Sequence, residues 1–196
     1  MSNIPVTGMS SGEFLRVFGS DPTPIHDDEI IIDIGSGLSR LEDIAPYGTI
    51  AQLDPIYSAS SDDGHCIKIP IEIGANTESK KAIKTLENKE IDRVTCGNTL
   101  RHLGVEDRAY VISQMLRLSV NGILQIYPTN QKRALGVINE AEKFGFEAII
   151  QSPQIRGIRQ LVYGVARVNT VFSIISQPVK VGPSDHLRMA RSIANI

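Results

Sequence analysis

The sequence predicts an α/β fold: a doubly wound, mainly parallel sheet of seven strands, with an antiparallel edge strand and helices on both faces. The first observation is that short apolar segments rich in isoleucine and valine alternate with longer segments whose apolar residues recur at helical spacing. The second is that no helical pattern separates the last two predicted strands, 146–151 and 160–168. Because parallel neighbours require a crossover helix, we expect this last pair to be antiparallel.

The predicted strands are identified by their apolar content and by the turn residues around them. Ile30 to Ile34 form a near-continuous β-branched run, which is typical of a strand buried on both faces. Alternating isoleucines in 66–73 indicate a strand with one more exposed face. In chain order, the predicted strands are 30–34, 49–54, 66–73, 91–96, 122–128, 146–151 and 160–168.

The predicted helices lie between these strands and end at helix-stopping residues. Pro46 ends the helix after the first strand, and Asn76 or Thr77 caps the helix after the third. Gly145 stands in the C-terminal capping position of the helix after the fifth strand. In chain order, the predicted helices are 11–19, 38–45, 76–89, 105–119, 130–145 and 184–196.

The length of 196 residues and the 41% apolar content allow one substantial hydrophobic core. We expect one domain over 1–168, with a short N-terminal lid helix, followed by a C-terminal extension over 169–196. Arg188 and Arg191 lie beside the apolar face of the helix in this extension. The extension is therefore expected to pack on its own domain, or to bind a protein partner or a second copy of the chain.

The composition excludes several classes of protein. A formal net charge of -2 gives no general attraction to nucleic acids or anionic membranes. Cys66 and Cys96 lie far apart and the histidines are scattered, so neither a disulfide framework nor a metal site is predicted. The N-terminus lacks the pattern of a signal peptide, and no apolar run reaches the length of a membrane span. We expect a soluble, cytoplasmic protein.

A glycine motif follows the first predicted strand. The strand ends in "DIGSG", Asp33 to Gly37, and leads into a helix, which places backbone N–H groups and a positive helix end at the carboxyl edge of the sheet. Glycine lets a ligand approach the backbone there. Asp54 ends the next strand, where a carboxylate can accept hydrogen bonds from both hydroxyls of a ribose. The pattern predicts a nucleoside site, and a plain turn with a solvated aspartate is the alternative.

Asp33 helps to distinguish between nucleosides. In a dinucleotide fingerprint the first glycine directly follows the strand, whereas here an acid stands two residues before the first glycine. A carboxylate repels a pyrophosphate but attracts an ammonium group, which it holds directly or through water. The ligand that we infer has a ribose and an amino-acid part.

Four segments together resemble the class I S-adenosylmethionine-dependent methyltransferases, a family with a Rossmann-like fold. "IIDIGSG" is similar to the first motif of that family, "AQLDP" to the second, "IDRVTCGNTLRHL" to the fourth-strand motif, and "MLRLSVNGILQIYP" to the helix, turn and fifth strand. The resemblance runs from about Ile30 to Pro128 in order and spacing. It implies that the cofactor is S-adenosyl-L-methionine and that its site comprises Asp33, Gly35, Ser36, Gly37, Asp54, Pro55, Ile73, Gly74, Cys96, Gly97 and Asn98.

The sequence also departs from the family pattern. Ser39 stands where a third glycine is frequent, and "IEIGANT" lacks the acid that often contacts the adenine amino group. Backbone atoms near Ile73 and Gly74 are then expected to hold the adenine. These differences leave open a catalytically inactive binding or scaffold protein on the same fold. A nicotinamide-dependent oxidoreductase is a third hypothesis.

The acceptor side of the site is expected after the fourth and fifth predicted strands. A general base is needed only if the acceptor must lose a proton, and His102 is the candidate, with a histidine packed in a turn as the alternative. Asn98, Arg101 and Tyr127 are candidates for binding the acceptor. The segment after Cys96 lacks the motifs of nucleic-acid methylation, and few residues precede the first strand. We therefore expect a small-molecule acceptor.

Overall fold

The structure is a computed structural model of the 196-residue chain. It describes residues 26–35, 47–55, 57, 59–86, 90–97, 99–151, 170–178 and 180–196. The predicted lid helix 11–19, the helix 38–45 and the strand 160–168 lie outside these residues.

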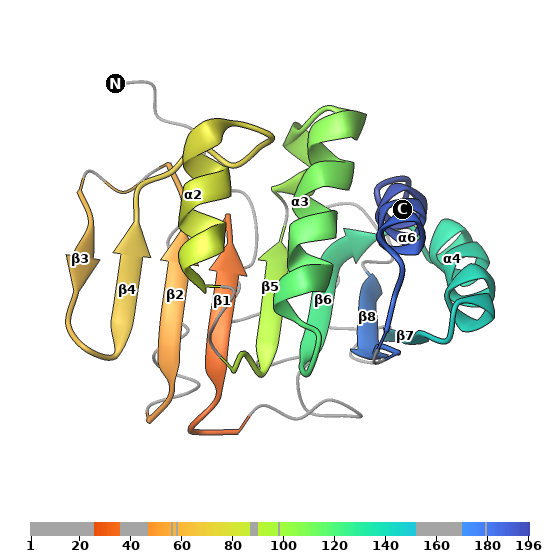
Figure 1. The fold of residues 1–196 in the computed structure, drawn as a ribbon, viewed down its shortest axis with the longest axis horizontal. Coiled ribbons are helices and arrows are strands. Elements are labelled where there is room, and N and C mark those ends of the chain that lie inside the picture. The colour runs from red at the N-terminus through yellow and green to blue at the C-terminus, as the bar shows by residue number, and fades with distance from the viewer. Residues whose placement is uncertain are drawn as a thin grey trace, which may run out of the picture.

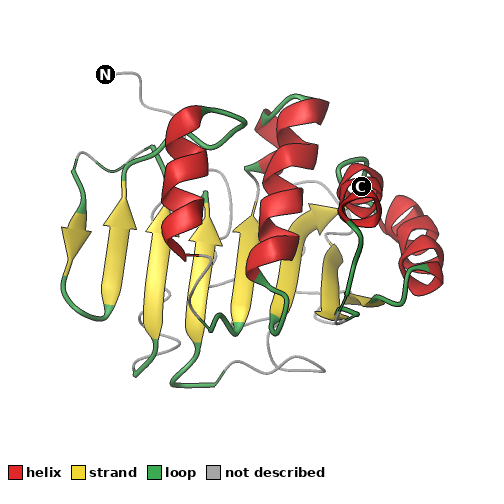
Figure 2. Cartoon of the chain, in the orientation of Figure 1, coloured by secondary structure: helices red, strands yellow, loops and turns green. Residues whose placement is uncertain are grey.

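Within the described residues, eight strands form one mixed sheet in the order β3-β4-β2-β1-β5-β6-β8-β7 (Figures 1 and 2). The five neighbouring strands from β4 to β6 run parallel, and antiparallel strands complete the sheet on both sides. The strands are β1 (Ile30–Ile34), β2 (Thr49–Leu53), β3 (Ser61–Asp62), β4 (Cys66–Ile69), β5 (Arg93–Gly97), β6 (Ile123–Thr129), β7 (Glu147–Gln151) and β8 (Thr170–Ser176). The predicted α/β fold with a mainly parallel sheet is confirmed.

The antiparallel strand differs in position from the prediction. On the side of β6 it is β8, which lies between β6 and β7 and is antiparallel to both, so β7 forms this edge, while the antiparallel strand β3 forms the opposite edge. β8 belongs to the segment that we assigned to the C-terminal extension. The sequence analysis did not predict a strand here because Pro178 and Pro183 interrupt the apolar segment. Both prolines follow β8, so they remove no hydrogen bond from it.

The opposite edge of the sheet contains a strand that the sequence analysis missed. β3 pairs with β4 in an antiparallel hairpin, and the Asp63 carboxylate accepts hydrogen bonds from the N–H groups of His65 and Cys66 in its turn. Exposed polar residues give no strand pattern, which explains the omission. β4 itself ends at Ile69, because Pro70 has no N–H to donate to the ladder.

The described helices are α2 (Thr77–Leu86), α3 (Val105–Leu118), α4 (Gln131–Lys143) and α6 (Pro183–Ile193), with a short 3-10 helix η2 (Leu100–His102). Figure 1 shows α2, α3 and α6 in front of the sheet. α6 packs against α3 and α4 and buries Met189, Ala190 and Ile193. Arg108 of α3 donates a hydrogen bond to the Ala194 carbonyl at 3.3 Å. The C-terminal helix thus contributes to the same core as the helices that precede it.

The two faces of the sheet differ in chemistry. On one face, isoleucine, leucine, valine and phenylalanine side chains pack with the helices into the hydrophobic core. Because side chains alternate along a strand, the register places five polar residues side by side on the other face. Each is at most 1% exposed. This polar row consists of Gln52, Asp33, Thr95, Gln125 and Ser173.

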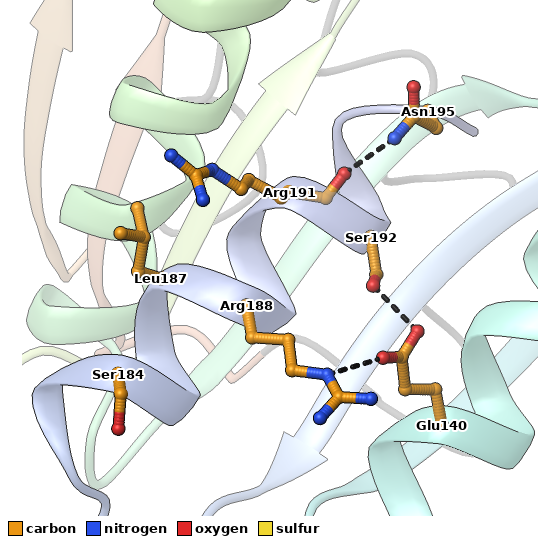
Figure 3. Close-up of a pocket in the computed structure, with 7 residues that line it drawn as sticks. All are labelled: Glu140, Ser184, Leu187, Arg188, Arg191, Ser192 and Asn195. Atoms are coloured by element: carbon orange, nitrogen blue, oxygen red, sulfur yellow. Dashed lines mark hydrogen bonds and ion pairs between the residues drawn. The ribbon is translucent and has the colours of Figure 1, made fainter.

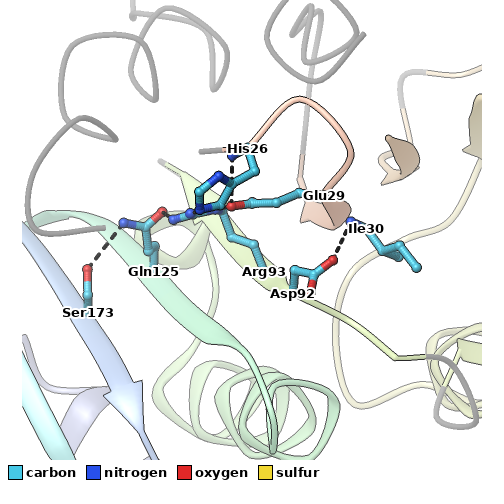
Figure 4. Close-up of polar contacts among 7 residues, drawn as sticks. All are labelled: His26, Glu29, Ile30, Asp92, Arg93, Gln125 and Ser173. Carbon is cyan, nitrogen blue, oxygen red and sulfur yellow. Dashed lines mark hydrogen bonds and ion pairs between the residues drawn. The ribbon is translucent and has the colours of Figure 1, made fainter. Parts of the chain in front are cut away.

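An ion-pair network lies at the amino end of the polar face (Figure 4). Arg93 of β5 donates from Nε and Nη2 to the Glu29 carboxylate at 2.8 and 2.9 Å, and from Nη1 to Gln125 Oε1 at 2.8 Å. Gln125 Nε2 in turn donates to Ser173 Oγ at 3.3 Å. The His26 N–H adds a bond to Glu29 Oε1 at 3.1 Å. The planar guanidinium makes this bidentate arrangement, and the network joins the residue before β1 to β5, β6 and β8.

Candidate functional site

The carboxyl ends of β1 and β2 bring the predicted nucleoside-binding residues together. Asp33 is the fourth residue of β1, and the Gly35 N–H donates to the Leu53 carbonyl of β2 at 2.7 Å. Asp54 and the exposed Pro55 directly follow β2. Since β1 lies between β2 and β5, these residues meet the end of β5 at one edge of the sheet.

Gly35 makes the turn out of β1 with a positive φ of 71°. Side chains other than glycine rarely adopt this conformation. Thr99, from the loop after β5, packs against this turn, and its Oγ1 donates to the Gly35 carbonyl at 3.1 Å. A Cβ atom on Gly35 would lie 1.8 Å from Thr99 Oγ1, so both the backbone and the close approach require glycine. Ser36 and Gly37 lie outside the described residues.

The pKa of the Cys96 thiol reflects the charges at this edge. Burial raises the pKa of the Cys96 thiol, and the carboxylates of Asp33 and Asp54 raise it further. The thiol therefore stays neutral, which argues against a thiolate nucleophile. The negative potential that disfavours the thiolate favours a cationic ligand group at the same edge.

The loop between β4 and α2 contains the predicted adenine-binding residues. Ile73 and Gly74 are buried, and the Gly74 N–H donates to Ser79 Oγ at 3.3 Å. The next amide, Ala75 N–H, donates to Asp107 Oδ1 in the first turn of α3 at 3.0 Å. Asp107 thus brings a carboxylate to this loop. The sequence analysis missed Asp107, because a contact across 32 residues leaves no local signal.

The predicted acceptor residues follow β5 or lie near the end of β6. His102 is exposed at the end of η2. Tyr127 lies in β6, beside Gly97 of β5 in the register. Asn98 is outside the described residues, as are the side chains of Arg101 and Tyr127. Roles in acceptor binding and proton removal stay predictions for these residues.

Thr95 is a buried polar residue that the sequence analysis did not consider. It lies beside Asp33 of β1 and Gln125 of β6, and it is 0% exposed. Its Oγ1 has no hydrogen-bond partner within the described part of the chain. A sequence signal exists, because Arg93 and Thr95 alternate with apolar residues in a strand that is otherwise suited to a buried sheet.

A pocket of about 540 Å³ lies between α4 and α6 (Figure 3). The Glu140 carboxylate accepts a hydrogen bond from Ser192 Oγ at 2.6 Å and one from Arg188 Nε at 3.1 Å. These two bonds, with that of Ser192 the stronger, lower the pKa of Glu140. In Figure 3 the Arg191 side chain points away from Glu140. The paired groups hold α4 and α6 together, while binding of a partner through this helix stays a prediction.

The described ranges contain neither a cluster of metal ligands nor a membrane-spanning helix. No group of three or more His, Cys, Asp or Glu side chains in these ranges is placed to hold a metal ion. Of the helices that the structure describes, none has the length and apolar content needed to cross a membrane. Cys66 and Cys96 are both buried, and neither forms a disulfide within the described residues.

Two solved structures with a similar fold are methyltransferase domains. No family model matches the chain, and a comparison with curated proteins also finds no match. The methyltransferase domain of bacterial CtHen1-C has a TM-score of 0.51 and 11% identity, over 78% of this chain and 91% of that chain. The CtHen1-CN methyltransferase domain has a TM-score of 0.50 and 11% identity, over 76% and 91% of the two chains. The chain therefore has the fold of the class I S-adenosylmethionine-dependent methyltransferases, as its motifs predicted.

Proposed function

We propose that this chain is an S-adenosylmethionine-dependent methyltransferase with a small-molecule acceptor. The observation that carries the proposal is the arrangement at the carboxyl edge of the sheet. Asp33 is buried two residues before the left-handed turn at Gly35, and Asp54 follows the neighbouring strand. On a methyltransferase fold, this edge is where a ligand with a ribose and an amino-acid part would bind.

The chemistry of the residues present fits this cofactor. Asp33 and Asp54 create a negative potential, which suits a ligand that carries a sulfonium and an ammonium group. Asp54 would accept hydrogen bonds from the ribose hydroxyls, and the backbone at Ile73 and Gly74 would hold the adenine. The bound cofactor supplies an electrophilic methyl group. The residues of the chain would then position the acceptor and exclude water from it.

The proposed acceptor is a small molecule because the net charge of -2 provides no general attraction to nucleic acid. His102 is the proposed base for an acceptor that must lose a proton, and its exposed position after β5 would give it access to such a molecule. Arg101, Asn98 and Tyr127 are proposed to orient the acceptor.

One contact favours the alternative of an inactive binding or scaffold protein. The Thr99 hydroxyl donates to the Gly35 carbonyl and lies against the glycine turn. If this contact is permanent, Thr99 takes space that a ligand close to the glycine backbone would need. In an active enzyme, the Thr99 side chain would have to move away from the turn or contact the bound cofactor.

Thermal unfolding with added ligands tests the proposed function. A ligand that binds only the folded protein at a hundred times its Kd stabilises it by about 2.7 kcal/mol. We expect S-adenosylmethionine and S-adenosylhomocysteine to raise the melting temperature and NAD to leave it unchanged. Asp54→Ala should abolish the shift, whereas the matched variant Asp62→Ala, in the exposed β3 hairpin, should retain it. No shift in a folded wild-type protein would support the scaffold alternative.

A further inference from the structure

The polar row is unusual for its position in the fold. Strands of a parallel sheet that is covered on both faces are usually apolar on both. Here five polar side chains cross five neighbouring strands, β2, β1, β5, β6 and β8, at one level of one face. Because they are buried, solvent does not satisfy them, and each needs a partner within the protein or in a ligand.

Most of the polar row is satisfied within the protein. Gln52 Oε1 accepts a hydrogen bond from the Tyr57 hydroxyl at 3.3 Å. Gln125 bonds to Arg93 and donates to Ser173. By contrast, the Thr95 hydroxyl has no partner among the described residues. A buried hydroxyl without a partner destabilises the folded state, so its retention in the middle of a core strand calls for a role in binding.

Thr95 and Asp33 are the last side chains on their strands before the carboxyl edge on this face. They are neighbours in the register of β1 and β5. The next residues with the same facing, two positions along each strand, are Gly35 and Gly97, which carry no side chains. Neither strand therefore places a side chain of its own between this pair and the edge where the cofactor is proposed to bind. The side chain that lies against Gly35 there is that of Thr99, from the loop after β5, and the ligand would require it to move.

The two groups suit a cation with several donors. A carboxylate accepts hydrogen bonds only, whereas a threonine hydroxyl accepts two and donates one. An ammonium group has three donors, so it can bond to both side chains at once. The Thr95 hydroxyl can donate its own proton to the Asp33 carboxylate at the same time. An anionic group would be repelled by Asp33, which makes a carboxylate or phosphate a poor occupant.

We propose that Thr95, together with Asp33, binds the ammonium group of the amino-acid part of S-adenosylmethionine. This inference rests on the proposed function and specifies how the cofactor is oriented at its amino-acid end. It gives Thr95 a binding role that the glycine motif and the ribose carboxylate do not provide. It also explains why β5 has threonine at position 95, where valine would fill the same space without a buried hydroxyl.

Calorimetric titration with two ligands tests the inference. S-adenosylhomocysteine carries the ammonium group, and 5'-methylthioadenosine lacks the whole amino-acid part. Thr95→Val keeps the side-chain shape and removes the hydroxyl. We expect it to weaken S-adenosylhomocysteine binding about tenfold, in line with the loss of a hydrogen bond to a charged group, and to leave 5'-methylthioadenosine binding unchanged. Thr95→Ser, which keeps the hydroxyl, should restore most of the affinity.

Stability provides an independent readout. Thr95→Val removes a buried hydroxyl for which the described part of the chain offers no partner, so the variant should melt at the wild-type temperature or above it without ligand. The matched control Ser173→Ala removes a buried hydroxyl of the same row that does have a partner. It should melt lower and keep the wild-type preference between the two ligands.

Distinct results would overturn the inference and the proposed function. If the wild-type protein binds S-adenosylhomocysteine but Thr95→Val weakens both ligands equally, or weakens neither, the ammonium role of Thr95 is wrong and the proposed function stands. If the folded wild-type protein binds neither ligand, the proposed function fails, and the inference fails with it.

Discussion

The buried polar groups at the two ends of the polar face differ in their hydrogen-bond partners. At the amino end, Arg93 bonds to the Glu29 carboxylate and also reaches Gln125 of the polar row, so its guanidinium has partners within the protein (Figure 4). At the carboxyl end, the Thr95 hydroxyl beside the Asp33 carboxylate has no hydrogen-bond partner among the described residues. Both regions are buried to the same degree, so solvent does not explain the difference. Polar groups that bond to one another stabilise the fold, whereas a polar group without a partner in the protein is suited to bind a ligand.

The comparison also separates the energetic roles of the two ends. The Arg93 side chain is 0% exposed and that of Glu29 7%, so both charges have lost most of their hydration. Such a pair adds little net stability over apolar residues of similar size, but removal of one partner leaves the other charge buried. Single substitutions at the amino end should therefore lower the free energy of unfolding, whereas single substitutions at the carboxyl end should weaken ligand binding.

The largest expected effect is the loss of Glu29. Glu29→Ala would leave the Arg93 guanidinium buried without its carboxylate and should lower the free energy of unfolding by about 3–5 kcal/mol, measured by urea denaturation. The double variant Glu29→Leu with Arg93→Met should recover much of this loss, because it buries no charge. If Glu29→Ala costs less than about 1 kcal/mol, the pair behaves like a solvated surface salt bridge, and the contrast between the two ends disappears.

A glycine series probes the carboxyl end and should show the next largest effect. Gly35→Ala combines a positive φ with a clash against Thr99, so it should cost more than the roughly 1–2 kcal/mol of left-handed backbone alone and should abolish cofactor binding. Gly64→Ala isolates the backbone cost, because φ is +84° and nothing lies within 4 Å of the added Cβ. Gly104→Ala has neither penalty, but Gly104 is the N-cap of α3, where alanine is less favourable than glycine, so the variant should cost about 1 kcal/mol or less.

The outcome of this series decides how rigid the glycine turn is. Unfolding free energies from denaturant titration give the stability costs, and calorimetry with S-adenosylhomocysteine gives the binding. If Gly35→Ala costs no more than Gly64→Ala, Thr99 moves aside without penalty. That result would also weaken the argument that Thr99 blocks the turn in an inactive protein.

Much of the fold was predictable because its signals are local. The β-branched run at 30–34 and the helical periods of 105–119 and 130–145 predicted elements that the structure contains within a few residues. β8 was not predicted as the inner antiparallel strand, because the partner of a strand depends on segments far away in the sequence. The two-residue strand β3 is too short and polar to show any period.

The site was predictable only where a motif carries its own geometry. The need for glycine at position 35 follows from a turn directly after a strand, and the structure places Asp54 after the neighbouring strand. Thr99 and Asp107 became visible only through contacts across 64 and 32 residues. Thr95 is easily noticed in the sequence as a polar residue in an apolar strand. That its hydroxyl has no hydrogen-bond partner among the described residues can be seen only in the structure.

The smallest expected effect comes from His186 in α6, which also carries an unpaired atom. Its Nε2 is buried without a partner among the described residues, yet it belongs to the helix layer and not to the polar row. Burial lowers the pKa of His186, the positive charge of Arg117 lowers it further, and Asp185 partly offsets both. An unpaired buried group of this kind should affect the pH dependence of stability without any link to a ligand.

The sign of the effect follows from proton binding. Because the folded pKa of His186 lies below its unfolded value, the unfolded chain takes up a proton that the folded protein refuses as the pH falls. The stabilisation is therefore fully present above about pH 6.5 and declines below it, toward the folded pKa. Urea denaturation between about pH 5 and pH 8 should show a shallower decline for His186→Gln than for the wild type. The two proteins differ only at this residue, so the difference between the two curves isolates His186.

The same variant sharpens the distinction between the two unpaired groups. At a pH above the His186 titration, His186→Gln should bind S-adenosylhomocysteine like the wild type, whereas Thr95→Val should bind it more weakly. If His186→Gln also weakened binding, substitution of a buried polar group would disturb the fold in general. The effect of Thr95→Val would then not identify the ligand site. The argument for Thr95 depends on its place beside Asp33 at the carboxyl edge, and this pair of variants tests that dependence directly.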